Sequence, residues 1–153
     1  MAHSPFTLLN QAGTADRFVT LVAIVLDTQT HTVTVVNAGH PAPLVVRQAS
    51  GEIEEAAAKA AGLPLGVLDG FTYDSCQVVL QPGDCILAFT DGVSEAMDRQ
   101  HNQFQVQGIL QAIREGWAAP AALGERIVGH VKKHAAGRSQ NDDITLVCLG
   151  RAL

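Results

Sequence analysis

Acidic residues at the ends of two apolar segments are the part of this sequence best suited to chemistry. Asp91 follows the apolar run CILAFT and precedes Gly92, and the pair Asp142 and Asp143 directly precedes the apolar run ITLVCL. A carboxylate at the end of a buried strand is held rigidly, and a neighbouring glycine allows a tight turn that a side chain would block. If the two strands are neighbours in one sheet, the carboxylates cluster at one rim, where a hard divalent cation relieves their repulsion.

The same aspartates also have a purely structural interpretation. Asp91 could cap a short helix around residues 93–96, and Asp142 could be a turn residue. Because helix caps are commoner than metal sites, the spacing of these residues does not by itself establish a metal centre.

Two histidines also have the spacing of metal ligands. His130 and His134 lie four residues apart in HVKKH, so they share one face of a helix. The glutamate of the zinc-protease motif is missing, and the two intervening lysines would repel a cation. We therefore expect a solvated face near a helix C-terminus, where protonated histidines interact favourably with the helix dipole.

The elements that must position these residues begin as strands. Residues 18–27 form a nearly continuous β-branched and apolar run, which is typical of a strand covered on both faces, or nearly so. A turn at 28–31 and the run HTVTVVNAG complete a hairpin. We expect further strands at 44–47, 71–80 and 85–89, an edge strand at 52–55, and an alanine-rich connector at 56–62 that is either a helical turn or a loop.

The pattern then changes to helical periodicity. Two helices are expected, and the second begins near Pro120 and ends at Gly137. A helix tail at 4–12 precedes the first strand, and ITLVCL closes the chain as a strand. Segregated strands and helices indicate an α+β architecture rather than alternating βαβ units. The apolar faces of the two helices carry Phe104, Ile109, Leu110, Ile113 and Trp117, then Leu123, Ile127, Val128 and Val131.

Composition limits the class of protein. The chain has 153 residues, of which 47% are hydrophobic and 16% charged, so it suits one globular domain and is not globally disordered. A net charge of −5, with no basic cluster beyond Lys132 and Lys133, argues against nucleic-acid binding. The apolar stretches are too short to cross a bilayer and the N-terminus does not resemble a signal peptide, so we expect a soluble, cytoplasmic protein. The cysteines, Cys76, Cys85 and Cys148, are expected to be buried, reduced strand residues.

Five stretches together resemble a known family. RFVTLVAIVLD, VTVVNAGHPAPLVV, GLPLGV, LQPGDCILAFTDGVSEAM and SQNDDITLVCLG stand in the order and at the spacing of PPM-type, metal-dependent serine/threonine protein phosphatases of the bacterial SpoIIE-like branch. Each stretch alone is weak evidence, whereas all five together are highly specific. The resemblance runs from about Phe6 to the C-terminus, and it implies an αββα sandwich of two antiparallel sheets flanked by helices.

The resemblance implies a mechanism and roles for individual residues. The family holds two Mn²⁺ or Mg²⁺ ions, and a metal-bridging hydroxide, rather than a protein side chain, attacks the phosphorus of phosphoserine or phosphothreonine. Asp91, beside Gly92 in TDG, and Asp142 in NDD match metal-ligating aspartates, and Asp143 matches a supporting residue. His40 in NAGH matches an aspartate that helps to hold a third metal in many relatives; its alternative is a loop histidine hydrogen-bonded to backbone.

Two patterns with which the family begins, GDYYD and D-V-S/A-G-H-G, do not occur in this sequence. We therefore expect residues 1–153 to form a single SpoIIE-like domain that lacks its first strands and part of its first helix. Two carboxylates alone would bind a divalent ion weakly, and an open sheet edge would allow self-association or pairing with a partner. We expect the chain by itself to show little phosphatase activity.

The resemblance favours one function and leaves others open. It implies a phosphatase in bacterial sigma-factor partner switching, whose substrate is a phosphorylated protein such as an anti-anti-sigma-type regulator. The alternative is a catalytically degenerate module that binds a signalling partner, because the upstream metal aspartates are absent. A structural or oligomerising role is the third interpretation.

Overall fold

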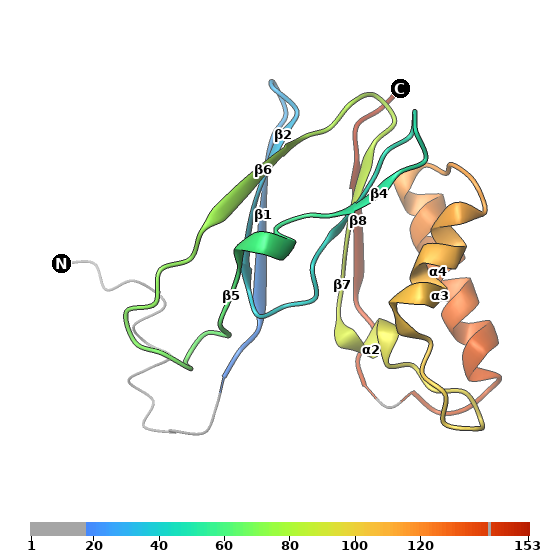
Figure 1. Cartoon of the computed structure of the whole chain (residues 1–153). Helices are drawn as coiled ribbons and strands as arrows, with labels where there is room; N and C mark the ends of the chain where they lie inside the picture. The colour runs from blue at the N-terminus through green and yellow to red at the C-terminus, as the bar shows by residue number, and fades with distance from the viewer. Residues whose placement is uncertain (1–17, 141) are drawn as a thin grey trace. The chain divides into compact units, whose positions relative to one another are not determined.

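The fold is described for residues 18–140 and 142–153 of a computed structural model (Figure 1). The helix tail expected at residues 4–12 lies outside the described residues. Within the described ranges the chain forms two β-sheets, three α-helices and one short 3₁₀-helix. The strands come first and two long helices follow before the last strand, so the predicted α+β class is confirmed.

The chain divides into two compact units. The first unit comprises the residues up to Ala42 together with Ala56–Val78, and the second comprises Pro43–Glu55 together with Val79–Leu153. Each unit contains one of the two sheets. The organisation of residues 1–153 as a single domain stays a prediction.

A β-hairpin is the main feature of the first unit. β1 (Leu21–Asp27) pairs antiparallel with β2 (Thr32–Ala38), as the sequence predicts. The Asp27 carboxylate closes the turn, because its Oδ1 accepts the backbone N–H groups of Gln29 (2.8 Å) and Thr30 (3.2 Å). Two further strands pair with β2, namely the parallel β5 (Ala61–Gly62) and β6 (Ser75–Val79).

Two elements of the first unit differ from the expectation. β1 is not covered on both faces: Ala23 and Val25 are exposed, Val25 to 67%. The apolar composition of this strand could not show this, because coverage of a second face depends on which layer packs against it. The strand expected at 71–80 is confined to β6. The alanine-rich connector contains one 3₁₀ turn, η1 (Ala58–Ala60), in agreement with one of its two predicted alternatives.

The sheet of the second unit has the strand order β4–β3–β7–β8 and is antiparallel throughout. β7 is buried along its whole length, and β4 lies at the edge, as expected. β7 and β8 are direct neighbours, so the end of one meets the beginning of the other. The neighbourhood on which the metal hypothesis depends is therefore present. The strands are β3 (Leu44–Val46), β4 (Ile53–Glu55), β7 (Cys85–Phe89) and β8 (Leu146–Gly150).

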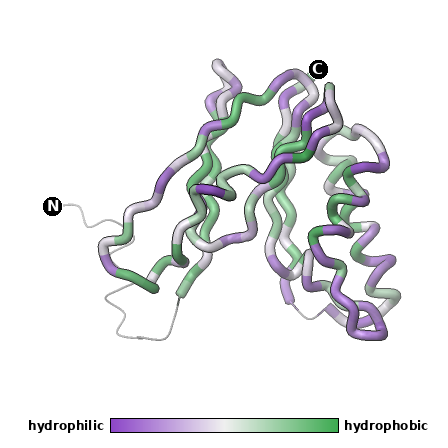
Figure 2. Tube along the Cα trace, in the orientation of Figure 1, coloured by the Kyte–Doolittle hydropathy of each residue, from purple (hydrophilic) through white to green (hydrophobic). Residues whose placement is uncertain are grey.

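Helices cover one face of this second sheet. α2 (Asp91–Ser94) continues from β7, and α3 (Gln105–Arg114) and α4 (Pro120–Ala135) lie side by side (Figure 1). Figure 2 shows that β7 and β8 are mainly hydrophobic, whereas the segment between α2 and α3 is mainly hydrophilic. Strands and helices share one core of buried residues: Leu44, Cys85, Leu87, Phe89, Val93, Ile109, Ala112, Ile113, Leu123, Ile127 and Val131.

The helix ends follow the sequence signals, with one exception. Pro120 is the first residue of α4, and Gly137 follows its C-terminus with φ of 82°. Trp117, expected on the buried face of the first helix, lies beyond the end of α3 and is 50% exposed. Its indole Nε1 donates a hydrogen bond to the carbonyl of Gly83 (3.0 Å), and this polar contact holds it at the surface.

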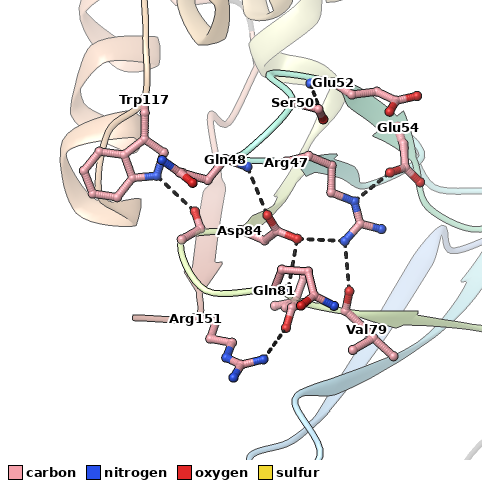
Figure 3. A network of polar contacts seen from close by, with 12 residues as sticks. Arg47, Gln48, Ser50, Glu52, Glu54, Val79, Gln81, Asp84, Trp117 and Arg151 are labelled. Atoms are coloured by element: carbon pink, nitrogen blue, oxygen red, sulfur yellow. Dashed lines mark hydrogen bonds and ion pairs between the residues drawn. The ribbon is translucent and has the colours of Figure 1, made fainter. Parts of the chain in front are cut away.

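Asp84 is the centre of a polar network in the second unit (Figure 3). Its buried carboxylate accepts hydrogen bonds from Arg47 Nη1 (2.8 Å) and from the backbone N–H groups of Gln81 and Gln48 (both 3.0 Å). Burial would raise the pKa of Asp84, but the Arg47 guanidinium and the two amides outweigh it and lower the pKa below its ordinary value of 3.8. Arg47 also pairs with Glu54 (2.6 Å), so the network joins β3 and β4 to the turn before β7.

Candidate metal centre

The first acidic residue lies where β7 becomes α2. Thr90 precedes the helix and Asp91 is its first residue, so Asp91 is not the N-cap that the structural interpretation proposed. The Asp91 side chain is exposed, and its Oδ1 accepts a hydrogen bond from the backbone N–H of Gly92 (3.0 Å). This bond fixes one carboxylate oxygen against the start of α2.

The second acidic segment leads into β8. Asp142 and Asp143 are both exposed, and Asp142 Oδ1 accepts the backbone N–H of Asp143 (2.7 Å). The Gln140 side-chain amide also donates to the carbonyl of Asp142. Asn141, the first residue of the NDD motif, lies outside the described residues.

Thr90 joins the two segments. Its hydroxyl donates to the carbonyl of Asp143 (2.9 Å) and accepts the backbone N–H of Thr145 (3.0 Å), while its own N–H donates to the Thr145 carbonyl (3.0 Å). The two acidic segments, 53 residues apart in the sequence, are therefore side by side. Sequence reasoning identified the aspartates and missed Thr90, although a hydroxyl at a strand end is the signal that could have indicated it.

Gly92 is required by the same close approach. A Cβ built on Gly92 would lie 2.4 Å from the carbonyl oxygen of Asp143, which is far inside van der Waals contact. The glycine thus allows the start of α2 to lie against the backbone of the segment before β8. Its role here is packing, and a direct role in metal binding stays a prediction.

His40 belongs to a separate, rigid turn in the first unit. The buried Asn37 side chain bonds both sides of the His40 backbone: its Nδ2 donates to the carbonyl (2.9 Å) and its Oδ1 accepts the N–H (2.8 Å). The imidazole Nδ1 lies 3.4 Å from Thr20 Oγ1. These contacts agree with a loop histidine bonded through its backbone, and its role at a third metal stays a prediction.

The donor atoms suit a hard cation but form only part of a ligand set. Within residues 18–140 and 142–153, no group of three or more His, Cys, Asp or Glu side chains is placed to hold a metal ion. Asp91, Asp142 and Asp143 offer oxygen donors, and Mg²⁺ is commonly held by one or two carboxylates together with water and substrate phosphate. The oxygen donors of these residues are of the type that Mg²⁺ and Mn²⁺ prefer, and they do not make a closed site of the zinc type.

The other candidate side chains have structural partners. His130 pairs with Glu115 (3.0 Å), and His134 bonds the carbonyl of Asn102 (2.9 Å) and packs on the Phe104 ring. Both histidines are half-buried with different partners, so the face expected to be solvated is partly covered. The spacing in HVKKH places them on one helix face, but only the neighbouring loops decided what they contact.

The cysteines form no disulfide in the structure. All three are free thiols in strands; Cys85 is buried, whereas Cys76 and Cys148 are half-buried. The neighbouring Cys148 thiol, and then burial, raise the pKa of Cys85, which therefore stays protonated.

No helix among the described residues has the length and apolar character needed to span a membrane.

The sequence matches the family described as stage II sporulation protein E (SpoIIE) over residues 4–152. Among curated proteins, it is 24% identical over 144 residues to Protein IcfG of Synechocystis sp.. That alignment covers 94% of this chain and 22% of IcfG, so the chain spans about a fifth of this relative.

Solved structures share the fold. The PP2C phosphatase domain of SpoIIE from Bacillus subtilis matches with a TM-score of 0.71 at 20% identity, over 94% of this chain and 41% of that one. The RsbU and RsbW domains of Rv1364c from Mycobacterium tuberculosis match with 0.63 at 25%, over 87% and 36%. The catalytic domain of the phosphatase PstP, solved with two manganese ions, matches with 0.56 at 16%, over 84% and 56%. The chain therefore has the fold of PP2C phosphatase domains.

Proposed function

The chain belongs to the SpoIIE family and is homologous to PP2C serine/threonine phosphatase domains, and from this premise we propose that it hydrolyses phosphoserine or phosphothreonine in a protein substrate with the help of Mn²⁺ or Mg²⁺. One observation carries the proposal. A hydrogen bond from the Thr90 hydroxyl to the Asp143 carbonyl (2.9 Å) joins the turn bearing Asp91 to the segment bearing Asp142. Two exposed carboxylates at one rim of a PP2C-type fold are suited to binding a hard cation.

Each residue of the rim has a distinct task in this proposal. Asp91 and Asp142 bind the metal, and Asp143 supports Asp142 through its backbone N–H. Thr90 holds the two segments in register, and Gly92 allows their backbones to approach. A bound metal supplies Lewis acidity, which activates water and stabilises charge on the phosphoryl group. No protein side chain is assigned as the nucleophile.

The partner proposal follows the relatives. The RsbU and RsbW domains and the SpoIIE domain among the structural neighbours lead us to place the chain in sigma-factor partner switching. Its substrate would be a phosphorylated regulator of the anti-anti-sigma type, which presents a phosphoserine on its surface. The cytoplasm is the compartment that such a partner implies.

A binding module without catalytic activity is the second candidate. It is favoured by the absence, within the described ranges, of any group of three metal-binding side chains. In that case the chain would hold a signalling protein without removing phosphate, and Asp91 and Asp142 would have only structural roles.

Metal binding separates the two candidates. We expect calorimetric titration with Mn²⁺ to detect binding at millimolar or lower concentration, because few protein ligands give a weak site. Asp91→Asn and Asp142→Asn should each weaken binding by about ten-fold or more, since each removes a charged ligand. Asp74→Asn, which removes an exposed carboxylate in the first unit, is the matched control and should have no effect.

Turnover is measured alongside binding as phosphate release from a phosphoserine peptide. The phosphatase proposal requires release that depends on Mn²⁺ and is lost in Asp91→Asn. We expect the isolated chain to be slow, in keeping with its few carboxylates. A wild-type chain that binds no Mn²⁺ at millimolar concentration and releases no phosphate would contradict the phosphatase proposal and support the binding-module function.

A further inference from the structure

A pocket of about 160 Å³ adjoins the candidate metal centre within the second unit. It lies between α2, the C-terminal part of α4 and the segment that leads into β8. Met97, Val131 and Ile144 contribute apolar surface, and Lys132, Arg138 and Asp142 contribute polar groups. Sequence reasoning did not identify this pocket, because its walls come from three separate segments.

The pocket shares residues with the metal site. Asp142 lines it, and so does Gly92, which packs against the backbone of Asp143. A peptide whose phosphorylated residue reaches Asp91 and Asp142 therefore has this pocket directly beside it. The position suits recognition of residues that flank the phosphorylation site.

The pocket as a whole has room for about one side chain. An apolar cavity of about 150 Å³ accommodates a benzene molecule, so a volume of about 160 Å³ can receive a leucine or phenylalanine side chain. Val131 is buried in the core, and Met97 and Ile144 are half-buried, so these walls are supported by the fold. Methionine also adapts its shape to different apolar ligands.

The α4 side of the pocket is cationic. Lys132 is exposed, and in the described part of the chain its ammonium forms no ion pair. Arg138 is half-buried and oriented, because its Nη1 donates to the carbonyl of Asp98 (2.9 Å) and lies 3.2 Å from His101 Nδ1. Glu95, which directly follows α2, and Asp142 are the acidic residues of the lining. A ligand with an acidic group toward α4 is therefore complementary to the pocket.

We propose that this pocket binds the segment of the phosphoprotein substrate next to its phosphorylated serine or threonine, with an apolar side chain between Met97, Val131 and Ile144 and an acidic side chain paired with Lys132 and Arg138. This inference rests on the proposed phosphatase function and names the sequence class of its substrate. Lys132 and Arg138 are specificity residues here and do not take part in the chemical step.

The first test uses the methionine methyl groups of the full chain. The chain contains two methionines, Met97 in the pocket and Met1, which serves as an internal reference. A ¹³C-methyl-methionine sample is titrated with a phosphoserine peptide that carries a leucine and a glutamate within three residues of the phosphoserine. We expect the Met97 resonance, assigned with Met97→Leu, to shift while that of Met1 does not. A Met97 resonance that stays unchanged at saturating peptide overturns the proposal.

A matched pair of lysine variants provides the second test. Lys132 lines the pocket, whereas its neighbour Lys133 does not, and both are exposed on the same helix end. Lys132→Gln should weaken peptide affinity by about five-fold, the size expected of a partly solvated ion pair, while Lys133→Gln should change it less than two-fold. The effect of Lys132→Gln should disappear with a peptide whose glutamate is replaced by glutamine. Equal effects of both variants would mean that only net charge matters and would sink the proposal.

Running each titration with EDTA and with Mg²⁺ separates this proposal from the phosphatase function. The apolar and lysine contacts do not use the metal, so the Met97 shift is expected in both conditions. A shift of the Met97 resonance without any Mn²⁺ binding or phosphate release would support peptide binding in the pocket and contradict the phosphatase function. Metal-dependent phosphate release without a shift of the Met97 resonance would support the phosphatase function and contradict peptide binding in the pocket.

Discussion

At the scale of single residues, Thr90 contributes most to the geometry of the candidate metal centre. It is the last residue before α2, and its hydroxyl serves both the Asp143 carbonyl and the Thr145 amide. Each of these groups would otherwise need water as a partner. The carboxylates of Asp91 and Asp142 carry the chemistry in our proposal, but their relative position depends on this one side chain and on the small size of Gly92.

Replacing the Thr90 hydroxyl tests this role. Thr90→Val keeps the shape of the side chain but leaves two backbone groups without a partner, so we expect a loss of about 1–2 kcal/mol in the free energy of unfolding, measured in urea. Mn²⁺ affinity should fall in the same variant. Thr90→Ser retains the hydroxyl and should restore metal affinity; a serine variant as impaired as the valine variant would contradict the assignment.

Adding a methyl group at Gly92 tests the close approach of the two segments. The Cβ of Gly92→Ala would meet the Asp143 carbonyl at 2.4 Å, so the segments must separate at a cost of about 1–3 kcal/mol. Gly129→Ala in α4 is the control, because nothing lies near its Cβ, and it should stabilise the helix by about 0.5–1 kcal/mol. Thermal unfolding of both variants checks the opposite signs.

At the scale of elements, the second sheet owes its order to contacts between segments far apart in sequence. β7 is central and buried, and the pairing of Phe89 with Leu146 brings the end of β7 to the start of β8. At the other end of β7, the Asp84 carboxylate joins the turn before β7 to Arg47, just after β3. One end of this strand is therefore held by an ion pair and the other presents the acidic rim.

The Asp84 ion pair should make stability depend on acid. Asp84→Asn removes the buried carboxylate partner of Arg47, which keeps Glu54 and the Val79 carbonyl as partners, and we expect a loss of about 1–3 kcal/mol at neutral pH. The folded-state pKa of Asp84 lies below 3.8, so the stabilisation is present above pH 3.8 and is lost as the pH falls through the folded-state pKa. Urea unfolding from pH 7 to pH 2.5 should show the wild type and the variant converging at the acid end. A constant difference across this range would show that Asp84 acts without titrating.

At the scale of the whole molecule, the residues proposed to bind the metal are different from the residues of the buried core. The buried core of the second unit is apolar, and the proposed metal ligands Asp91 and Asp142 are exposed. The SpoIIE family match over residues 4–152 concerns nearly the whole chain, although the chain spans about a fifth of IcfG.

Metal removal tests this separation. We expect EDTA to leave the circular dichroism spectrum unchanged and to abolish phosphate release. Added Mn²⁺ at ten times its dissociation constant should stabilise the fold by only about 1.4 kcal/mol, which is the mass-action effect of a single weak site. Unfolding on treatment with EDTA would instead mark the metal as a structural component.

The amino-acid sequence by itself determined the local features of this protein. The hairpin, the α+β order, the ends of α4 and the aspartates at two strand ends all follow from periodicity, turn residues and motifs that lie within short stretches. Family membership was also predictable, because five such stretches occur in a fixed order. These features depend on neighbouring residues, and their signals are therefore readable along the chain.

Only the tertiary structure decided which distant residues meet. Arg47 and Asp84 are 37 residues apart, and Thr90 and Asp143 are 53 apart, so no local pattern could pair them. The exposed face of β1 and the partners of His130 and His134 were likewise decided by packing layers and loops. A side chain's type limits the bonds that it can form, but its partner is set by the fold that brings the two together.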